Sequence, residues 1–497
     1  AKLDSPEVEI WQGRAFETGG RLAYQPVVEA LRSRLEVINA PEDLLEDVWL
    51  AELSQLMPEL RARYPDLPPP LTGDAHFVRA RLFEAMALLG SALAADQTAV
   101  LVFDDLQWAD ADTLNMIHYL ARRWTEIGAP IVLLLTVRQE AYAADATLRE
   151  WLASLGRDAS MTRLLLDSLS GEAVQQLVNH LAGENVDEPT MISTMSAFAA
   201  WLWAETRGLP FFIEALLQML VEQGVLPVTG ESPLVYDFAE AMEHVRLVAQ
   251  VPLPPGVREV IQARLAQHSK EEGALLLAAA VSGRTCTFER LCQVADLPET
   301  DALEALETLL DSRLLMERPA DRRPYTLAHD YIREVVYSEA HEARRRVFHR
   351  RALLALEAAD APAAECAFHA LAALLDEPAF RYSVAAGHEA FTSYATREAL
   401  GHFNTALDVS GRMQERGESQ DPNLLALLYQ ERGQALVLVN DDEAVQSNYD
   451  AMRTFAVQRQ DRTLELAALL SLSNLYGHYT SLFNPIKARE MAREALA

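Results

Sequence analysis

Two adjacent carboxylates, Asp104 and Asp105, have the clearest capacity for chemistry in this sequence, because they end the hydrophobic run 100–103. Open α/β sheets bind their ligands at the carboxyl ends of their strands, which is where such a pair would lie. A carboxylate in that place can hold Mg²⁺, and a second can orient or deprotonate an attacking water molecule. We therefore predict that Asp104 binds a metal ion and that Asp105 is the catalytic residue that activates water.

Two hydrophobic segments must position this acidic pair. Residues 98–105 and 131–138 are apolar runs that end in charged residues, a pattern that predicts parallel strands buried under helices on both faces. Residues 112–124, between them, have helical spacing, so the three segments predict a βαβ unit. A further strand is predicted at 8–13, and a helix follows it at 27–35.

The middle of the chain is predicted to be helical, in two groups. The first group comprises helices at 171–181, 191–206 and 211–222, with Ser170 as the N-cap of the first and a hairpin or loop at 225–236. Prolines in 251–256 forbid a helix and predict a linker. The second group comprises helices at 257–267, 271–281, 288–295 and 299–312, followed by two short strands within 314–329. Helices followed by a β-hairpin predict a winged-helix domain.

The C-terminal segment contains an internal repeat. Alanines seven residues apart recur at offsets of about 45 residues, and a glycine precedes each pair. The pairs are Ala399/Ala406, Ala444/Ala451 and Ala488/Ala495, and the glycines are Gly387, Gly433 and Gly477. Small residues at fixed places let two helices approach closely, and a period of this size predicts stacked helix pairs.

Composition excludes several classes of protein. The formal net charge of −30 disfavours contact with nucleic acid or an anionic membrane, so any DNA binding is predicted to lie on a segment outside this chain. The basic run 344–351 is best explained as a solvated helix face. No run approaches the length of a membrane span, and the first residues do not resemble a signal peptide. Three cysteines without metal-ligand spacing fit a reduced cytoplasmic protein.

The string Asp-Asp-Leu-Gln-Trp-Ala-Asp at 104–110 resembles the Walker B region of the STAND class of signalling ATPases, which are relatives of the AAA+ proteins. Other stretches resemble segments of the same family in the same order. They are 13–17 with 24–26, the strand end 136–138, the Gly-x-Pro stretch 208–217, and 327–337. The resemblance covers nearly the whole chain and includes the repeats.

The resemblance implies roles for four further residues. Arg138 would read the γ-phosphate of ATP, Gly208 and Pro210 would lie near the adenine, and His329 would reach the β-phosphate of ADP in a resting state. Each has a simpler alternative. Arg138 could be a solvated arginine at a strand end, Gly208 and Pro210 could start a helix, and His329 could be a half-buried histidine. Asp330 is predicted to cap the following helix.

The sequence departs from the family in having no phosphate-binding loop. Such a loop needs glycines followed by Gly-Lys-Ser/Thr, and none of the three lysines, Lys2, Lys270 and Lys487, follows a glycine. Because the later motifs are intact, we expect the loop to lie upstream of Ala1, and we expect this chain alone to bind ATP poorly.

Together these observations predict a multidomain α/β plus α protein. The expected parts are a truncated P-loop NTPase parallel sheet at 1–168, a helical lid at 169–250, a winged helix at 251–350 and a TPR-like α-solenoid at 351–497. The expected function is a cytoplasmic switch controlled by ATP, ADP and Mg²⁺, with slow ATP hydrolysis. An inducer or protein partner would bind the repeats, the ATP form would self-associate, and the output would be an activity such as transcription activation. The alternative is a non-hydrolysing scaffold that binds proteins through its repeats.

Overall fold

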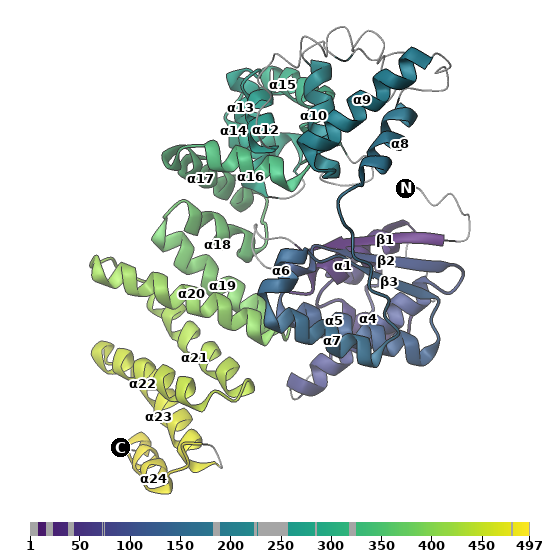
Figure 1. Ribbon diagram of the computed structural model, residues 1–497. Helices are drawn as coiled ribbons and strands as arrows, with labels where there is room; N and C mark the ends of the chain where they lie inside the picture. Colours follow the sequence, from purple (N-terminus) through teal and green to yellow (C-terminus); the bar gives the residue numbers. More distant parts are fainter. Residues whose placement is uncertain are drawn as a thin grey trace. The chain divides into compact units, whose positions relative to one another are not determined.

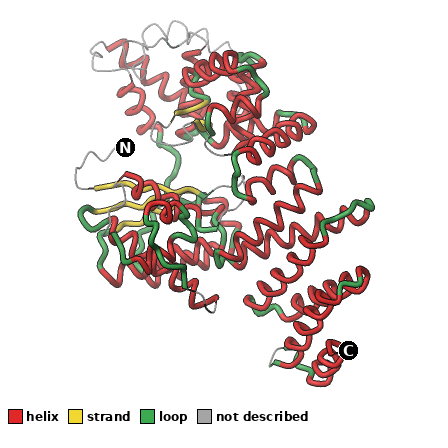
Figure 2. Tube along the Cα trace, turned by 180° about the vertical axis from the view of Figure 1, so that it is seen from behind, coloured by secondary structure: helices red, strands yellow, loops and turns green. Residues whose placement is uncertain are grey.

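The computed structural model describes residues 8–15, 23–37, 44–71, 73, 75–181, 189–222, 226, 257–283, 286–317, 325–478 and 481–496. The chain divides into two compact units, and each is described here by itself. The first unit combines Ala1–Met161 with Leu356–Ala497, and the second is Thr162–Ala355. Helices dominate both units, and strands are few (Figure 2). The four predicted domains are finer than this division, and their boundaries stay predictions.

A three-stranded parallel sheet forms the centre of the first unit. Its order is β1 (Val8–Arg14), β2 (Thr98–Asp104) and β3 (Ile131–Leu135). Helix α1 (Gln25–Val37) follows β1, and α5 (Ala111–Ile127) connects β2 with β3, so the predicted βαβ unit is confirmed (Figure 1). The strand predicted at 131–138 is shorter than expected, because β3 ends before residues 136–138.

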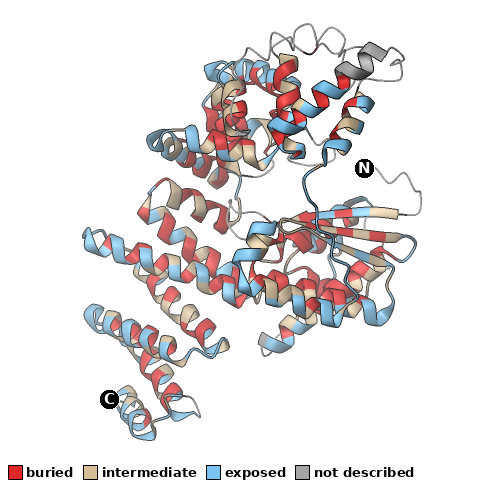
Figure 3. Ribbon diagram, viewed as in Figure 1, coloured by how far each residue is buried: buried red, intermediate tan, exposed pale blue. Residues whose placement is uncertain are grey.

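One prediction about this sheet is wrong, because β3 is not buried on both faces. Ala99, Leu101 and Phe103 of β2 point into the core and are fully buried. On the opposite face, the parallel register places Ile10, Val100 and Val132 in one row, and Ile10 and Val132 are 51% and 53% exposed. Figure 3 shows exposed residues on the strands of this sheet. An apolar run therefore did not distinguish a strand covered on two faces from a strand with one open apolar face.

Several helices of the first unit had no counterpart in the sequence-based prediction. Between β1 and β2 lie α2 (Asp47–Leu53), α3 (Glu59–Arg63) and α4 (Ala75–Leu93). After β3 come α6 (Gln139–Ala144) and α7 (Ala146–Asp158). Helix α4 packs against α5, where the indole Nε1 of Trp124 donates to the carbonyl oxygen of Ala87 at 2.9 Å.

The second unit begins with helices that match the predicted ones to within two residues. They are α8 (Gly171–Leu181), α9 (Pro189–Thr206), α10 (Pro210–Glu222) and α12 (Val257–Leu265). Ser170 caps α8 as predicted, since its Oγ accepts from the N–H of Ala173 at 3.2 Å. The predicted linker at 251–256, and the hairpin or loop at 225–236 apart from Leu226, lie outside the described residues.

The rest of the second unit has the element order expected of a winged helix. Helices α13 (Lys270–Ser282), α14 (Phe288–Ala295) and α15 (Glu299–Asp311) precede the antiparallel strands β4 (Leu315–Glu317) and β5 (Tyr325–Leu327). Helices α16 (Asp330–Glu339) and α17 (Glu342–Ala358) follow. The turn at 318–324 lies outside the described residues, and the assignment as a winged helix stays a prediction.

The remainder of the first unit is an array of paired helices. After α18 (Ala363–Ala372), the pairs are α19 (Asp376–Thr392) with α20 (Thr396–Glu415), α21 (Pro422–Leu438) with α22 (Asp442–Arg459), and α23 (Arg462–Gly477) with α24 (Pro485–Leu496). Each predicted glycine lies in the first helix of a pair. A Cβ on Gly387 would come within 2.3 Å of the Phe403 ring, so the glycine makes room for an aromatic ring from the second helix. Gly433 does the same for Tyr449. None of the helices that the structure describes is long and apolar enough to cross a membrane.

Candidate functional site

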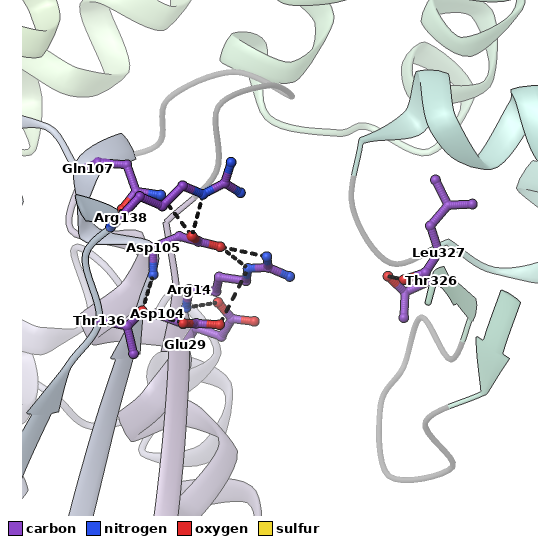
Figure 4. Close-up of polar contacts among 9 residues, drawn as sticks. All are labelled: Arg14, Glu29, Asp104, Asp105, Gln107, Thr136, Arg138, Thr326 and Leu327. Atoms are coloured by element: carbon purple, nitrogen blue, oxygen red, sulfur yellow. Dashed lines mark hydrogen bonds and ion pairs between the residues drawn. The ribbon is translucent and has the colours of Figure 1, made fainter. Parts of the chain in front are cut away.

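The carboxyl ends of the three parallel strands bring together the acidic pair and its neighbours. Arg14 ends β1 and lies beside Asp104 in the register of the sheet. Thr136 follows the last residue of β3, and Arg138 is the N-cap of α6. Figure 4 shows these side chains pointing toward Asp104 and Asp105 from both sides. This edge of the sheet is therefore the candidate site.

Asp104 is held by a hydroxyl group and remains accessible. Its Oδ1 accepts a hydrogen bond from Oγ1 of Thr136, and Nε of Arg14 lies 3.8 Å from its Oδ2. The Asp104 side chain is 32% exposed. The carboxylate and the Thr136 hydroxyl are hard oxygen donors of the kind that Mg²⁺ prefers, so the donors present fit the predicted ion.

Asp105 adopts an unusual backbone conformation that places its carboxylate between two arginines. Its φ is +57°, in the left-handed region that non-glycine residues seldom occupy. Thr136 holds this turn, because its Oγ1 accepts from the N–H of Asp105 at 2.9 Å and its carbonyl oxygen accepts from the N–H of Leu106 at 3.0 Å. The turn points the Asp105 side chain toward Arg14 on one side and Arg138 on the other (Figure 4).

The contacts of Asp105 with the arginines are unequal. Arg14 donates two hydrogen bonds to Oδ2, from Nε at 3.0 Å and from Nη2 at 2.6 Å. Arg138 donates one long hydrogen bond, from Nε to Oδ1 at 3.4 Å, and Gln107 donates to the same oxygen at 2.8 Å. Burial raises the pKa of Asp105, but the hydrogen bonds from Arg14 and Gln107 and the charges of both arginines outweigh burial and lower it. Asp105 is therefore an ionised carboxylate at neutral pH.

Sequence reasoning identified the acidic pair and the neighbouring Arg138 but missed Arg14. Arg14 makes the closest ion pair with Asp105, across 91 residues of sequence. The signal that would have found it is the register, since the last residue of a predicted parallel strand lies beside the last residue of its neighbour. The segment 13–17, which contains Arg14, was named only as a stretch that resembles the STAND family. Residues 16–17 lie outside the described part of the chain.

The carboxyl edge of the sheet brings together two carboxylates, two arginines and the hydroxyl group of Thr136. Among the residues that the structure describes, no group of three or more His, Cys, Asp or Glu residues could hold a metal ion. A single carboxylate is nevertheless enough for Mg²⁺ when phosphate oxygens complete its ligands. The full sequence has no Gly-Lys-Ser/Thr loop.

Gly208 and Pro210 lie in the second unit, in the turn that leads into α10 and at its first residue. Gly208 has a φ of +73°, and a Cβ there would come within 1.9 Å of the carbonyl oxygen of Leu169. Its own carbonyl oxygen accepts from the N–H of Leu169 at 2.8 Å. Pro210 is the first residue of α10, where its missing N–H has no cost. The geometry thus explains both residues as a tight turn and a helix start, and their predicted contact with adenine stays a prediction.

His329 also lies in the second unit, next to α10. Its ring stacks on Phe211, the residue after Pro210, with centroids 3.7 Å apart. The prediction that Asp330 caps α16 is wrong: the N-cap is His329, whose Nδ1 accepts from the N–H of Tyr331 at 3.1 Å. The histidine adopts the extended conformation of an N-cap, which puts Asp330 inside the helix. Because Nδ1 accepts a hydrogen bond, the proton of a neutral His329 lies on Nε2.

We call the carboxyl ends of the strands around Asp104 and Asp105 the acidic edge, and comparison with known proteins covers the part of the chain that contains it. Residues 5–137 match the family described as AAA ATPase domain. We refer to residues 5–137, which match this family, as the AAA domain. The match begins before β1 and ends after β3, so the three strands, the acidic pair and Thr136 all belong to the AAA domain. The predicted relationship to AAA-type ATPases is confirmed.

Two longer matches extend beyond the AAA domain. An uncharacterised protein of Rhizobium meliloti (strain 1021) is 27% identical over 369 residues, which cover 72% of this chain and 32% of that protein. The chain thus spans about one third of the length of this relative. A crystal structure of a STAND protein (signal transduction ATPase with numerous domains) with a tetratricopeptide repeat sensor, from Pyrococcus horikoshii, is 15% identical with a TM-score of 0.35. That match covers 98% of this chain and 70% of the other.

Proposed function

We propose that this chain is the acidic-edge and helical-repeat portion of a nucleotide-dependent signalling switch of the STAND class. The observation that carries the proposal is the carboxyl edge of the AAA sheet, where Asp104 stands beside Thr136 and Asp105 stands between Arg14 and Arg138. A scaffold without nucleotide chemistry has no need for two carboxylates and two arginines at the ligand-binding edge of a parallel sheet.

The arrangement supports a division of labour among these side chains. Asp104 would hold Mg²⁺, which supplies neutralisation of phosphate charge when bound. Asp105, ionised and turned away from the strand, would orient the attacking water. The Arg138 side chain is 48% exposed and its contact with Asp105 is 3.4 Å long, so its forked donor could turn toward a γ-phosphate.

The open side of the sheet supports a missing phosphate-binding element. Within the described residues, β3 pairs only with β2, so its outer edge has no partner strand. Val132 and Leu134 of β3 are 53% and 46% exposed. A parallel sheet is normally covered on both faces. We propose that a strand with a Gly-Lys-Ser/Thr loop and its helix add to the β3 edge and cover this apolar face.

The second unit provides candidates for the regulatory part. The stacking of His329 on Phe211 ties the start of α16 to the Gly-x-Pro helix α10, so a ligand that moved one would move the other. On this proposal Gly208 and Pro210 approach the adenine, and His329 approaches the β-phosphate of ADP. In the proposed cycle, an inducer binds the repeats, the ATP form self-associates, and the output is transcription activation. Any contact with DNA would lie on another segment. We place the protein in the cytoplasm.

Calorimetry with ADP and ATP in the presence of Mg²⁺ tests this function. The comparison is between this chain and the chain extended upstream by the proposed strand and phosphate-binding loop. We expect binding by the extended chain alone, and we expect Asp104→Ala to weaken ATP binding in a Mg²⁺-dependent manner. The control Asp145→Ala removes a helix cap elsewhere in the same unit and should leave binding unchanged. If the extended chain binds neither nucleotide, the switch is refuted and the repeat scaffold becomes the better account.

A further inference from the structure

The repeat helix α20 begins without a cap of its own. Its N-cap residue is Ala395, which has no side-chain oxygen to accept from the first N–H groups of the helix. The missing acceptor comes from the AAA domain: Oδ2 of Asp112 accepts from the N–H of Arg397 at 3.1 Å. Asp112 lies in the first turn of α5, 285 residues before Arg397 in the chain. A carboxylate at a helix N-terminus is stabilised by the N–H groups and by the helix dipole.

The Asp112 carboxylate that caps α20 is deeply buried. Asp112 is 2% exposed. Its other oxygen lies 3.6 Å from Nη1 of Arg79, and the Asp110 carboxylate is a neighbouring negative charge. Burying a carboxylate beside another is unfavourable unless its hydrogen bonds are made, so the folded chain depends on the Arg79 and Arg397 contacts.

A second link joins the same two parts of the first unit. Tyr24 is fully buried, and its hydroxyl donates to the carbonyl oxygen of Tyr394, in the turn between α19 and α20, at 3.3 Å. The N–H of Tyr24 donates to Oγ1 of Thr113 at 3.0 Å. Thr113 is the residue after Asp112, so the two links are connected through the first turn of α5.

Both links start from the chain segments that leave the candidate site. Asp112 is seven residues after Asp105, on the segment that leaves β2. Tyr24 is ten residues after Arg14, on the segment that leaves β1. The α19–α20 turn therefore contacts the continuations of the two strands whose ends form the closest ion pair of the site.

We propose that Asp112 and Tyr24 form a joint through which the helix pair α19–α20 and the acidic edge of the AAA domain influence each other's position. The joint connects the helix pair α19–α20 to the AAA domain, so a ligand that shifted this pair would act on the ends of β1 and β2. Coupling of this kind is reciprocal, so a change at the acidic edge would equally shift the repeat pair. The biological meaning of the joint rests on the proposed function, but the joint itself requires no nucleotide.

Hydrogen–deuterium exchange on this chain tests the cap. We expect Asp112→Ala to speed exchange of the first amides of α20 about fivefold, the effect of losing a typical N-cap. Asp112→Asn keeps an oxygen acceptor and should speed it less. The matched control is Asp145→Ala, which removes the carboxylate that caps α7 and should leave α20 unchanged. If Asp112→Ala and Asp145→Ala leave α20 equally protected, Asp112 does not hold the repeat pair and the proposal fails.

A perturbation made wholly within the repeats tests the coupling. Asp376 of α19 pairs with Arg412 of α20 at 3.2 Å and with Arg416, the C-cap residue of α20, at 2.5 Å. We expect Asp376→Ala to speed exchange of residues 105–113 about twofold to threefold, and we expect this effect to disappear in the Asp112→Ala background, as coupled sites require. Unchanged exchange of 105–113 in Asp376→Ala would overturn the coupling. Because no nucleotide is added, these results are independent of whether the calorimetric test of the switch succeeds.

Discussion

The ion pair between Arg14 and Asp105 allows a quantitative test of the candidate site. Arg14→Met removes the charge and both hydrogen bonds while keeping most of the aliphatic stem. Hydrogen bonds to a charged group contribute about 1.5–3 kcal/mol each when shielded from water. The Arg14 and Asp105 side chains are 28% and 13% exposed, so solvent screening reduces that figure. We expect a coupling free energy of about 1–2 kcal/mol between the two residues.

A double-mutant cycle measures this coupling directly. The variants are Arg14→Met, Asp105→Asn and the double substitution, and the observable is the free energy of local opening from hydrogen exchange of β2 amides. Local opening is preferable to global unfolding, because a chain of two units need not unfold in one step. Arg138→Met is the matched control. Its side chain is 48% exposed and its contact is 3.4 Å long, so its coupling with Asp105 should stay below about 0.5 kcal/mol.

The dependence on pH gives the same test a second readout. Because the pKa of Asp105 is lowered from its ordinary value of 3.8, its stabilising contribution is fully present above that value. The contribution is lost only as the pH falls through the lower pKa of the folded state. The coupling with Arg14 should thus be equal at pH 7 and pH 5 and decline below about pH 3.8. A coupling near zero at pH 7, or one that vanishes between pH 7 and 5, would refute the assignment of Arg14 as the principal partner of Asp105.

Two further predictions concern packing and a buried histidine. Gly387→Ala should destabilise the repeats by about 1–3 kcal/mol, because its Cβ would meet the Phe403 ring at 2.3 Å. The Cβ of Gly401→Ala in α20 would meet no atom within 4 Å, so this variant should stabilise the repeats by about 0.5–1 kcal/mol. Thermal unfolding of the two variants measures both effects. Burial, and next the charge of Arg345, lower the pKa of His349 to about 4. The contribution of neutral His349 to the stability of the folded state is therefore fully present above pH 6.5. Up to about 3 kcal/mol of it is lost as the pH falls to 4. The free energy of unfolding of the second unit should depend on pH in that window, and it should do so less in His349→Gln.

The sequence predicted most elements that have a strong local signal. Helices 288–295 and 171–181 were predicted to the residue, because threonine or serine caps and regular apolar spacing define them. The basic run 344–351 was predicted to be a solvated helix face; it is helical, but Phe348 and His349 within it are buried. The spacing located the helix in that case but not its rotation, since a helix rich in arginine has no continuous apolar stripe to fix the buried face.

The elements that the sequence did not predict are set by contacts between distant residues. Helices α2 and α3 are short, and Glu52 of α2 is completely buried through its ion pair with Arg81, a contact no local pattern reveals. The exposed face of β3 was missed for a related reason. Periodicity reports the apolar character of a strand, and whether a helix covers it depends on the rest of the fold.

The same reasoning explains why the acidic pair was found and its closest partner was not. Asp104 and Asp105 are neighbours in sequence, so their chemistry is visible in a short string. Arg14 joins them only because parallel pairing aligns the ends of β1 and β2. Asp112 is likewise an unremarkable helix residue until α20 begins beside it without a cap. In both cases a carboxylate is completed by a group from a distant segment, and both carboxylates lie on the chain that follows β2. If a variant that separates Asp112 from Arg397 leaves the Arg14–Asp105 coupling intact, the two contacts work independently. If the Arg14–Asp105 coupling is lost together with the Asp112–Arg397 contact, the helix pair α19–α20 helps to hold the acidic edge in place.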